Sequence, residues 1–303
     1  MSSTLLQLVQ QASAEMGLTV PTQVIGNTDT QVTQLYYLAN ALGNELRREY
    51  PWEALNKAYR FTTQYLITTG DVTDGSAVVT NIPDTSTLST NYMVTGTGIN
   101  QDTYILSVDS LTQVTLTQAA SASGTGVTLN FGQTIYQLPS DFDRQIDRTH
   151  YDKSKRWEML GPETAQQWEF LKSSYISTGP RMRYRFIGGN FQIWPQVTTN
   201  EYLGYEYVSN AWVASSGGTA QSSFLADTDT CIFPDRLVVL GLKMKFFETK
   251  GLDTTAFTRD YTSQLQIAKS NDGGSQTLSM APKMSSVLIG FENIPDGSIY
   301  GQG

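Results

Sequence analysis

The sequence predicts an α+β protein in which a discontinuous host domain, a helical bundle with a β-sheet, is interrupted by a small all-β domain. The main observation is an 83-residue stretch, Phe61 to Asp143, that contains no Lys, Arg or His. Nine of the twenty Lys and Arg then lie between Arg144 and Arg185. The stretch without basic residues consists largely of Thr, Ser, Gly and Val in short alternating runs, whereas both flanks carry helical patterns. Such a composition break inside a chain indicates an inserted domain.

These observations divide the chain into three parts. Residues 1–69 and 133–274 form the host domain, residues 70–132 form the inserted β domain, and residues 275–303 form an extended C-terminal arm. The arm is rich in Ser and Gly, has few charges and shows no regular hydrophobic period, so we expect it to gain order from a partner.

The host domain opens with two amphipathic helices, expected at residues 4–16 and 29–50. Capping boxes introduce both helices, formed by Thr4 with Gln7 and by Thr28 with Gln31. A strand with alternating aromatic residues is then expected over residues 59–67.

The insert contains short β-branched runs separated by Gly-rich turns such as Gly96-Thr97-Gly98. The expected strands are residues 77–80, 104–108, 113–117 and 127–131. Strands this short, with one apolar face each, are typical of a compact sandwich or barrel, for example an Ig-like module.

The host pattern resumes after the insert with further strands and helices. The expected elements are a strand at 134–138, a helix at 162–175 with Pro162 in its first turn, a hairpin of 181–187 and 191–194 across Gly188-Gly189, a strand at 202–208, and helices at 235–250 and 255–270.

Composition excludes several functional classes. The net charge of −8 argues against broad binding of nucleic acid, which requires neutralisation of phosphates. No apolar run approaches the length of a membrane span, and the opening Met1-Ser2-Ser3 does not look like a signal peptide, so no membrane partner is expected. The single Cys231 excludes an internal disulfide and is expected to be buried.

No catalytic, cofactor-binding or metal-binding site is expected, and the sequence does not predict an enzyme. His150 is the only histidine, and it lies in a polar stretch that we expect to be exposed. Asp141 and Asp143 could be paired carboxylates, but in a Pro-Ser-Asp context they are expected to form turns and caps.

Three arginines, Arg181, Arg183 and Arg185, alternate along one predicted strand and give it a basic face. The simpler interpretation is a solvated face paired with acids such as Glu201 and Glu206 on a neighbouring strand. The alternative is an interface with an acidic partner subunit or with passing DNA.

Several host segments, in the right order, resemble the head–tail adaptor (connector) family of short-tailed, podovirus-type bacteriophages. The segments are 46–52 (LRREYPW), 59–63 (YRFTT), 136–144 (YQLPSDFDR), 160–162 (LGP), 188–189 (GG), 206–212 (EYVSNAW) and 250–253 (KGLD). The insert departs from the minimal adaptor and resembles Thr/Gly-rich β modules of phage structural proteins.

The resemblance implies a structural virion protein at the neck, made in the cytoplasm of the bacterial host. It implies a ring of twelve copies that joins the portal protein to the tail nozzle or tail tube protein and continues the DNA ejection channel. DNA would pass without sequence-specific binding, and we expect an acidic inner wall.

In this family C-terminal extensions reach toward the portal, so residues 275–303 would form a docking arm. Its contacts would come from Val287, Leu288, Ile289 and Phe291, the alternative being a disordered end.

A second functional hypothesis is a virion protein that binds host glycan through the insert. Carbohydrate sites need aromatic platforms, and the insert offers Tyr92, Tyr104 and Phe131, of which Phe131 is expected in the core. An insert that decorates or braces the outside of the ring is the stronger interpretation.

Overall fold

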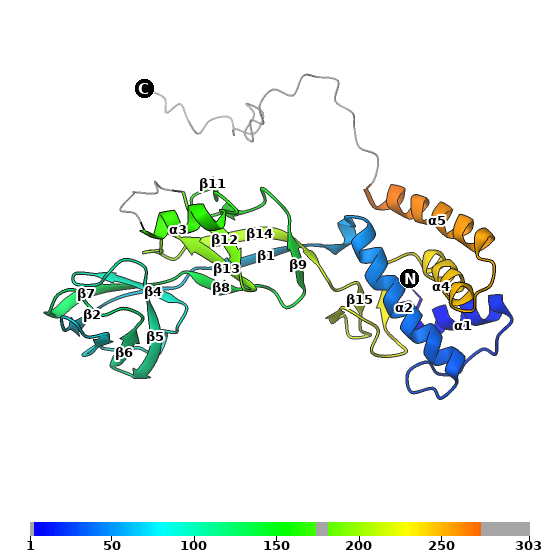
Figure 1. Ribbon diagram of the computed structural model, residues 1–303, viewed down its shortest axis with the longest axis horizontal. Helices are drawn as coiled ribbons and strands as arrows, with labels where there is room; N and C mark the ends of the chain where they lie inside the picture. Colours follow the sequence, from blue (N-terminus) through cyan, green and yellow to red (C-terminus); the bar gives the residue numbers. More distant parts are fainter. Residues whose placement is uncertain (1–2, 174–180, 274–303) are drawn as a thin grey trace, which may run out of the picture.

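The computed structural model describes residues 3–173 and 181–273. The chain forms an elongated α+β molecule, as the sequence predicts, with helices at one end, a mixed β region in the middle and a six-stranded sheet at the other end (Figure 1).

The helical end contains four helices, whose positions the sequence predicts well. They are α1 (Leu5–Met16), α2 (Thr30–Glu49), α4 (Asp235–Thr249) and α5 (Thr255–Gly273), with a short 3₁₀ helix, η1 (Glu53–Leu55), after α2. The capping box of Thr4 and Gln7 is confirmed. The expected cap at Thr28 is wrong: Asp29 caps α2, and its carboxylate accepts a hydrogen bond from the Gln31 backbone N at 2.8 Å.

The helices pack around a core that also takes in the small sheet of β15 (Val213–Ala214), β16 (Ala220–Gln221) and β17 (Thr230–Cys231). Helix α2 lies directly against Trp212, because a Cβ on Gly43 would lie 2.1 Å from the indole. Cys231 is buried in this core as expected, and burial raises the pKa of its thiol to about 12.

The middle region consists of two antiparallel sheets and α3 (Ala165–Ser173). The first sheet contains β1 (Asn56–Thr62), β14 (Tyr202–Ser209), β9 (Phe142–Gln145), β10 (Tyr151–Asp152) and β11 (Trp157–Glu158); the second contains β12 (Arg183–Ile187), β13 (Asn190–Trp194) and β8 (Ile135–Gln137). The expected hairpin across Gly188-Gly189 is confirmed. The expectation for Pro162 is wrong, because Thr164 and Gln167 form a capping box that starts α3 after it.

The six-stranded sheet runs in the order β2 (Tyr65–Val72), β7 (Gly124–Gln133), β4 (Tyr92–Gly96), β5 (Thr103–Ser110), β6 (Gln113–Leu116) and β3 (Val78–Val79). Asp71 and Thr80 exchange backbone hydrogen bonds of 2.8 and 3.1 Å, which bring its two edge strands together. The sheet therefore curls into a nearly closed barrel around its own core of buried residues such as Val94, Ile105 and Phe131.

Two expectations about these strands are wrong. The single strand expected over 59–67 is two strands, because β1 ends at Thr62 and β2 begins at Tyr65 in a different sheet. The sequence does not predict the strand β4, because its residues lead directly into Gly96-Thr97-Gly98, which is typical of a turn. Gly96 instead ends β4, and a Cβ there would lie 2.7 Å from the Thr128 carbonyl oxygen of β7.

His150 is buried in the aromatic core of the middle region, which corrects the expectation of an exposed side chain. Its ring is 1 % exposed and stacks on Tyr184, with centroids 4.0 Å apart, and on Tyr205 at 5.0 Å. Among the residues that the structure describes, neither ring nitrogen has a hydrogen-bond partner. Burial lowers the pKa of His150 to about 4, so the imidazole is neutral at pH 7.

This burial makes stability depend on pH. Because the folded-state pKa lies below the ordinary value of 6.5, the unfolded chain binds a proton first as the pH falls. We expect protonation of His150 to lower the free energy of unfolding by about 3 kcal/mol as the pH falls from roughly 6.5 to 4.

The measurement is urea unfolding across this pH range for the wild type and for His150→Phe, which keeps an aromatic ring. Carboxylates titrate in both proteins, so the difference between the two curves isolates the histidine. Parallel curves would contradict the expectation.

Candidate interaction surfaces

The chain passes between the middle region and the six-stranded sheet at one place. It enters β2 after Thr63 and leaves β7 at Gln133, and the Gln133 backbone N donates to the Gln64 carbonyl at 2.9 Å. The loop of residues 195–201 packs against the same place, where a Cβ on Gly132 would lie 2.8 Å from the Val197 carbonyl oxygen. We call this region the joint.

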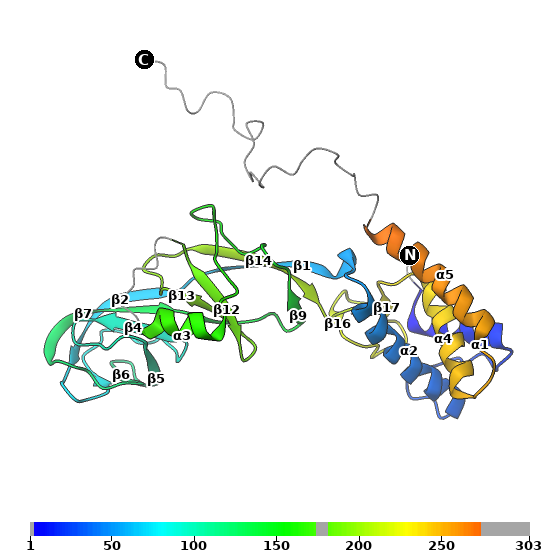
Figure 2. The same cartoon turned by 45° about the horizontal axis from the view of Figure 1, so that its top comes forward.

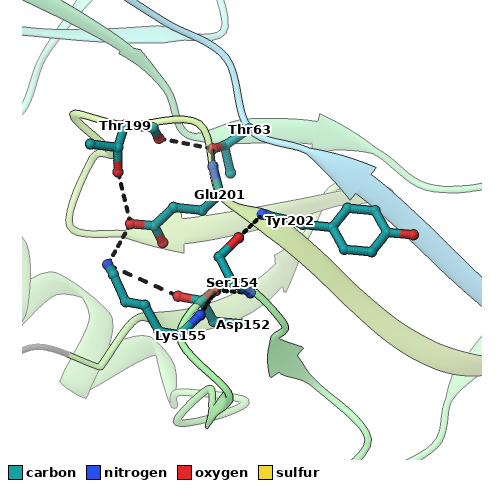
Figure 3. A network of polar contacts seen from close by, with 7 residues as sticks. All are labelled: Thr63, Asp152, Ser154, Lys155, Thr199, Glu201 and Tyr202. Atoms are coloured by element: carbon teal, nitrogen blue, oxygen red, sulfur yellow. Dashed lines mark hydrogen bonds and ion pairs between the residues drawn. The ribbon is translucent and has the colours of Figure 1, made fainter.

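A buried carboxylate organises the joint (Figure 3). Glu201 is 4 % exposed, and its Oε1 accepts hydrogen bonds from the Lys155 ammonium and from Thr199 Oγ1, the latter at 3.2 Å. The Glu201 backbone N donates to Thr63 Oγ1 at 2.8 Å, and the Thr63 backbone N donates to the Glu201 carbonyl at 2.9 Å. Burial raises the pKa of Glu201, although the bond from Lys155 acts to lower it.

The same network fixes the turn between β10 and β11. Asp152 Oδ1 accepts from the backbone N of Ser154 at 3.0 Å and of Lys155 at 3.1 Å, and Ser154 Oγ accepts from the Tyr202 backbone N at 2.7 Å. Lys155 therefore ties this turn to Glu201 at the joint.

Side chains from α3 complete the joint. Trp168 and Leu171 of α3 pack with Met93 of β4 and Trp194 of β13. Lys172 Nζ forms an ion pair with Asp102 Oδ1 at 3.1 Å. These contacts join the six-stranded sheet to the middle region through both apolar and charged groups.

An open cavity of about 610 Å³ lies beside the β10–β11 hairpin. Its lining combines two aromatic rings with charged residues: Tyr151, Asp152, Lys153, Arg156, Trp157, Glu158 and Arg181. We call it the hairpin cavity.

Cations without an ion pair are concentrated in the middle region. Within residues 3–173 and 181–273, seven of its Lys and Arg form no ion pair: Arg60, Arg144, Arg148, Lys153, Arg156, Arg181 and Arg185. Residues 56–62 and 134–209 carry eleven Lys and Arg against nine Asp and Glu, whereas residues 65–133 carry five Asp and no other charged residue. The middle region is thus the basic part of an acidic protein.

The three predicted arginines have different environments. Arg183 pairs with Glu163, Arg181 lines the hairpin cavity, and Arg185 is half-buried. The expected pairing of these arginines with Glu201 and Glu206 is wrong. The strands β12 and β14 belong to different sheets, and Glu201 forms its ion pair with Lys155. The sequence analysis did not identify residues 153–157 as part of a candidate surface. The available signal was the run of basic residues that ends in Trp157.

Asp141 and Asp143 do more than form a turn, which corrects that expectation. The Asp141 carboxylate accepts from Lys57 Nζ at 2.6 Å, Tyr207 OH at 2.7 Å and Ser209 Oγ at 2.7 Å. Burial acts to raise the pKa of Asp141, but these hydrogen bonds outweigh it and hold the pKa below its usual range. Asp143 pairs with Arg47 of α2 at 3.1 Å, which links β9 to the helical end.

The aromatic residues proposed as a glycan platform do not form one. Tyr92 and Phe131 are buried, and Tyr104 is half-buried beneath Lys172, whose Nζ lies 5.1 Å from the ring centroid. Val287, Leu288, Ile289 and Phe291 lie outside the described residues.

In residues 3–173 and 181–273 no group of His, Cys, Asp and Glu is arranged to hold a metal ion. Over the same residues no helix is both long and apolar enough to cross a membrane.

The joint generates a prediction about charge. Lys155→Met leaves the buried Glu201 carboxylate without its cation and raises the pKa of that carboxyl further. Because Lys155 is partly exposed, we expect a loss of only about 1–2 kcal/mol in the free energy of unfolding at pH 7. The loss should shrink as the pH falls through the raised pKa, since Glu201 then binds a proton in the folded state.

Chemical unfolding at pH 7 and pH 5 measures this effect. Lys153→Met, at an exposed neighbouring lysine without an ion pair, is the matched control and should change little. Adding Glu201→Gln to Lys155→Met should remove the pH dependence; its persistence would show that Glu201 is not the group responsible.

Comparison with known proteins supports one family. The family model described as SU10 adaptor protein matches residues 109–282, from within β5 to beyond the end of α5, which is more than half of the chain. No curated protein matches the chain. The family match agrees, at the level of a phage structural adaptor, with the resemblance seen in the sequence. The chain belongs to the SU10 adaptor protein family.

Proposed function

We propose that the protein is the head-to-tail adaptor of a short-tailed bacteriophage virion. Copies form a ring at the neck, twelve in number, that joins the portal protein to the tail nozzle or tail tube protein and continues the DNA ejection channel. The observation that carries the proposal is the family match over residues 109–282.

The shape of the subunit supports this proposal. The helical end and the six-stranded sheet lie at opposite ends of the longest axis, and each has its own hydrophobic core (Figures 1 and 2). A subunit with two separate ends can contact two different partners, so we assign the helical end to the portal and the β end to the tail. The ring would act through interface burial multiplied by symmetry.

The proposal predicts how many copies a virion holds. Quantitative mass spectrometry of purified virions should find this chain at a one-to-one ratio with portal subunits. Electron microscopy of the neck should place it as a ring between portal and tail, with an inner wall poor in Lys and Arg. Absence of the chain from virions, or a single copy per particle, would reject the function.

We further propose that the insert expected over residues 70–132, which β2 and β7 extend to 65–133, is a domain that braces or decorates the ring. Tyr65 pairs with Gly132 at the joint, so the two ends of this segment are adjacent. We expect a variant in which a short Gly-Ser linker replaces residues 65–133 to retain the helical end, with α-helical circular dichroism per molecule unchanged. Loss of the helical signal would show that the segment is needed for folding of the rest.

The C-terminal arm, residues 275–303, is proposed to dock on the portal. A chain that ends at Gly273 should still form rings but should bind the portal at least ~10-fold more weakly, which corresponds to about 1.4 kcal/mol. A full-length variant with Ser at Val287, Leu288, Ile289 and Phe291 separates loss of apolar contacts from loss of chain length. Unchanged portal binding by both variants would reject a docking role.

A further inference from the structure

The tip of the β5–β6 hairpin carries apolar side chains that face solvent. Leu106 and Leu111 are 60 % and 68 % exposed. Val108 faces the other side of the hairpin, because it pairs with the buried Val114. Asp109 lies on the side of Ser107 and Thr115, whose hydroxyls donate to its carboxylate, both at 2.7 Å. We call three residues the β5–β6 knob: Leu106, Asp109 and Leu111.

The knob belongs to a segment with one sign of charge. Asp109 has no cation within residues 65–133, because that segment contains no Lys, Arg or His. The segment before β4 lies beside the tip, since the Thr85 backbone N donates to the Leu111 carbonyl at 3.0 Å. The knob is therefore both apolar and acidic.

The hairpin cavity has the complementary character. Trp157, 38 % exposed, and Tyr151 provide apolar surface. Lys153, Arg156 and Arg181 provide cations that form no ion pair within the described residues, and Glu158 contributes a carboxylate in addition to that of Asp152. The carboxylate of Asp152 accepts bonds from the β10–β11 turn itself.

The two surfaces cannot meet within one chain. In Figure 1 the strands β5 and β6 lie at the lower edge of the molecule, and the β10–β11 hairpin lies at its upper edge. The strands β5 and β6 also lie at the lower edge in Figure 2. Two different and complementary surfaces on opposite edges are what a head-to-tail contact between identical subunits requires, and such contacts form a ring when the rotation between successive copies closes.

We propose that the β5–β6 knob of one copy binds in the hairpin cavity of the next copy, with Leu111 against Trp157 and Asp109 near Arg156. This inference rests on the proposed ring and names the surfaces that would build it. The joint gives the contact its geometry, because Lys155 and Glu201 fix the β10–β11 turn relative to the strand that leads into the six-stranded sheet. Charge complementarity would orient the copies, and burial of the leucines would stabilise the contact.

Site-specific crosslinking tests the pairing. Leu111→Cys and Arg156→Cys place single reactive thiols on the knob and in the cavity of the full-length chain, while Cys231 is 3 % exposed. With a flexible bis-maleimide reagent, at high protein concentration and again on portal, a mixture of the two variants should give a covalent dimer. Neither variant alone should, and the double variant should give a ladder of oligomers.

Charge and polarity variants supply the second test, read by sedimentation. Arg156→Glu and Leu111→Asp should each weaken self-association at least ~10-fold. Mixed one to one, they should form dimers that do not extend, because one intact knob meets one intact cavity and both outer surfaces are blocked. Matched controls are Arg48→Glu, an exposed arginine of α2, and Leu225→Asp, which is 61 % exposed in the helical end. Both controls should assemble like the wild type.

The outcomes separate this inference from the function on which it rests. Rings on the portal without the mixed crosslink, or with assembly unaffected by Arg156→Glu and Leu111→Asp, would overturn the inference and leave the adaptor function standing. Failure to form rings at all would overturn both. Binding of duplex DNA by the hairpin cavity, lost in Arg156→Glu while rings still form, would assign these cations to DNA and also overturn it.

Discussion

The position of the six-stranded sheet depends on the joint, because only two adjacent strands connect this sheet to the rest of the chain. Two strands that cross a boundary leave rotation about it free unless side chains oppose it. Here the Glu201 backbone bonds to Thr63, the buried Glu201 carboxylate accepts from Lys155, and Trp168 packs against Met93. A buried charge is costly unless it is paired, so any rearrangement that separates Glu201 from Lys155 is opposed.

A similar principle links the middle region to the helices. Arg47 of α2 is 7 % exposed and forms an ion pair with Asp143. The Asp141 carboxylate accepts hydrogen bonds from Lys57, Tyr207 and Ser209. Asp143 therefore links the sheet to the helix bundle, whereas Asp141 ties β1 to β14 within the sheet.

The distribution of charge suits a protein that functions through contacts between copies and with other virion components. The Lys and Arg side chains that form no ion pair within the described residues are concentrated in the middle region. In residues 65–133, which form the six-stranded sheet, the only charged residues are aspartates. An overall charge of −8 coexists with this local basic surface. Such separation favours oriented association over binding to polyanions in general.

The sequence by itself determined the local elements, because helix periodicity, capping residues and hairpin glycines act over a few neighbouring residues. It therefore predicted the α+β class, four helices of the helical end and the hairpin across Gly188-Gly189. It could not place His150, whose polar neighbours in sequence differ from the aromatic rings around it in space. Nor could it pair Glu201 with Lys155 or split the strand at Thr63, since partners 46 residues apart or more are decided by packing between sheets. Only the tertiary structure brought the joint, the hairpin cavity and the knob into view, because each depends on which segments burial places side by side.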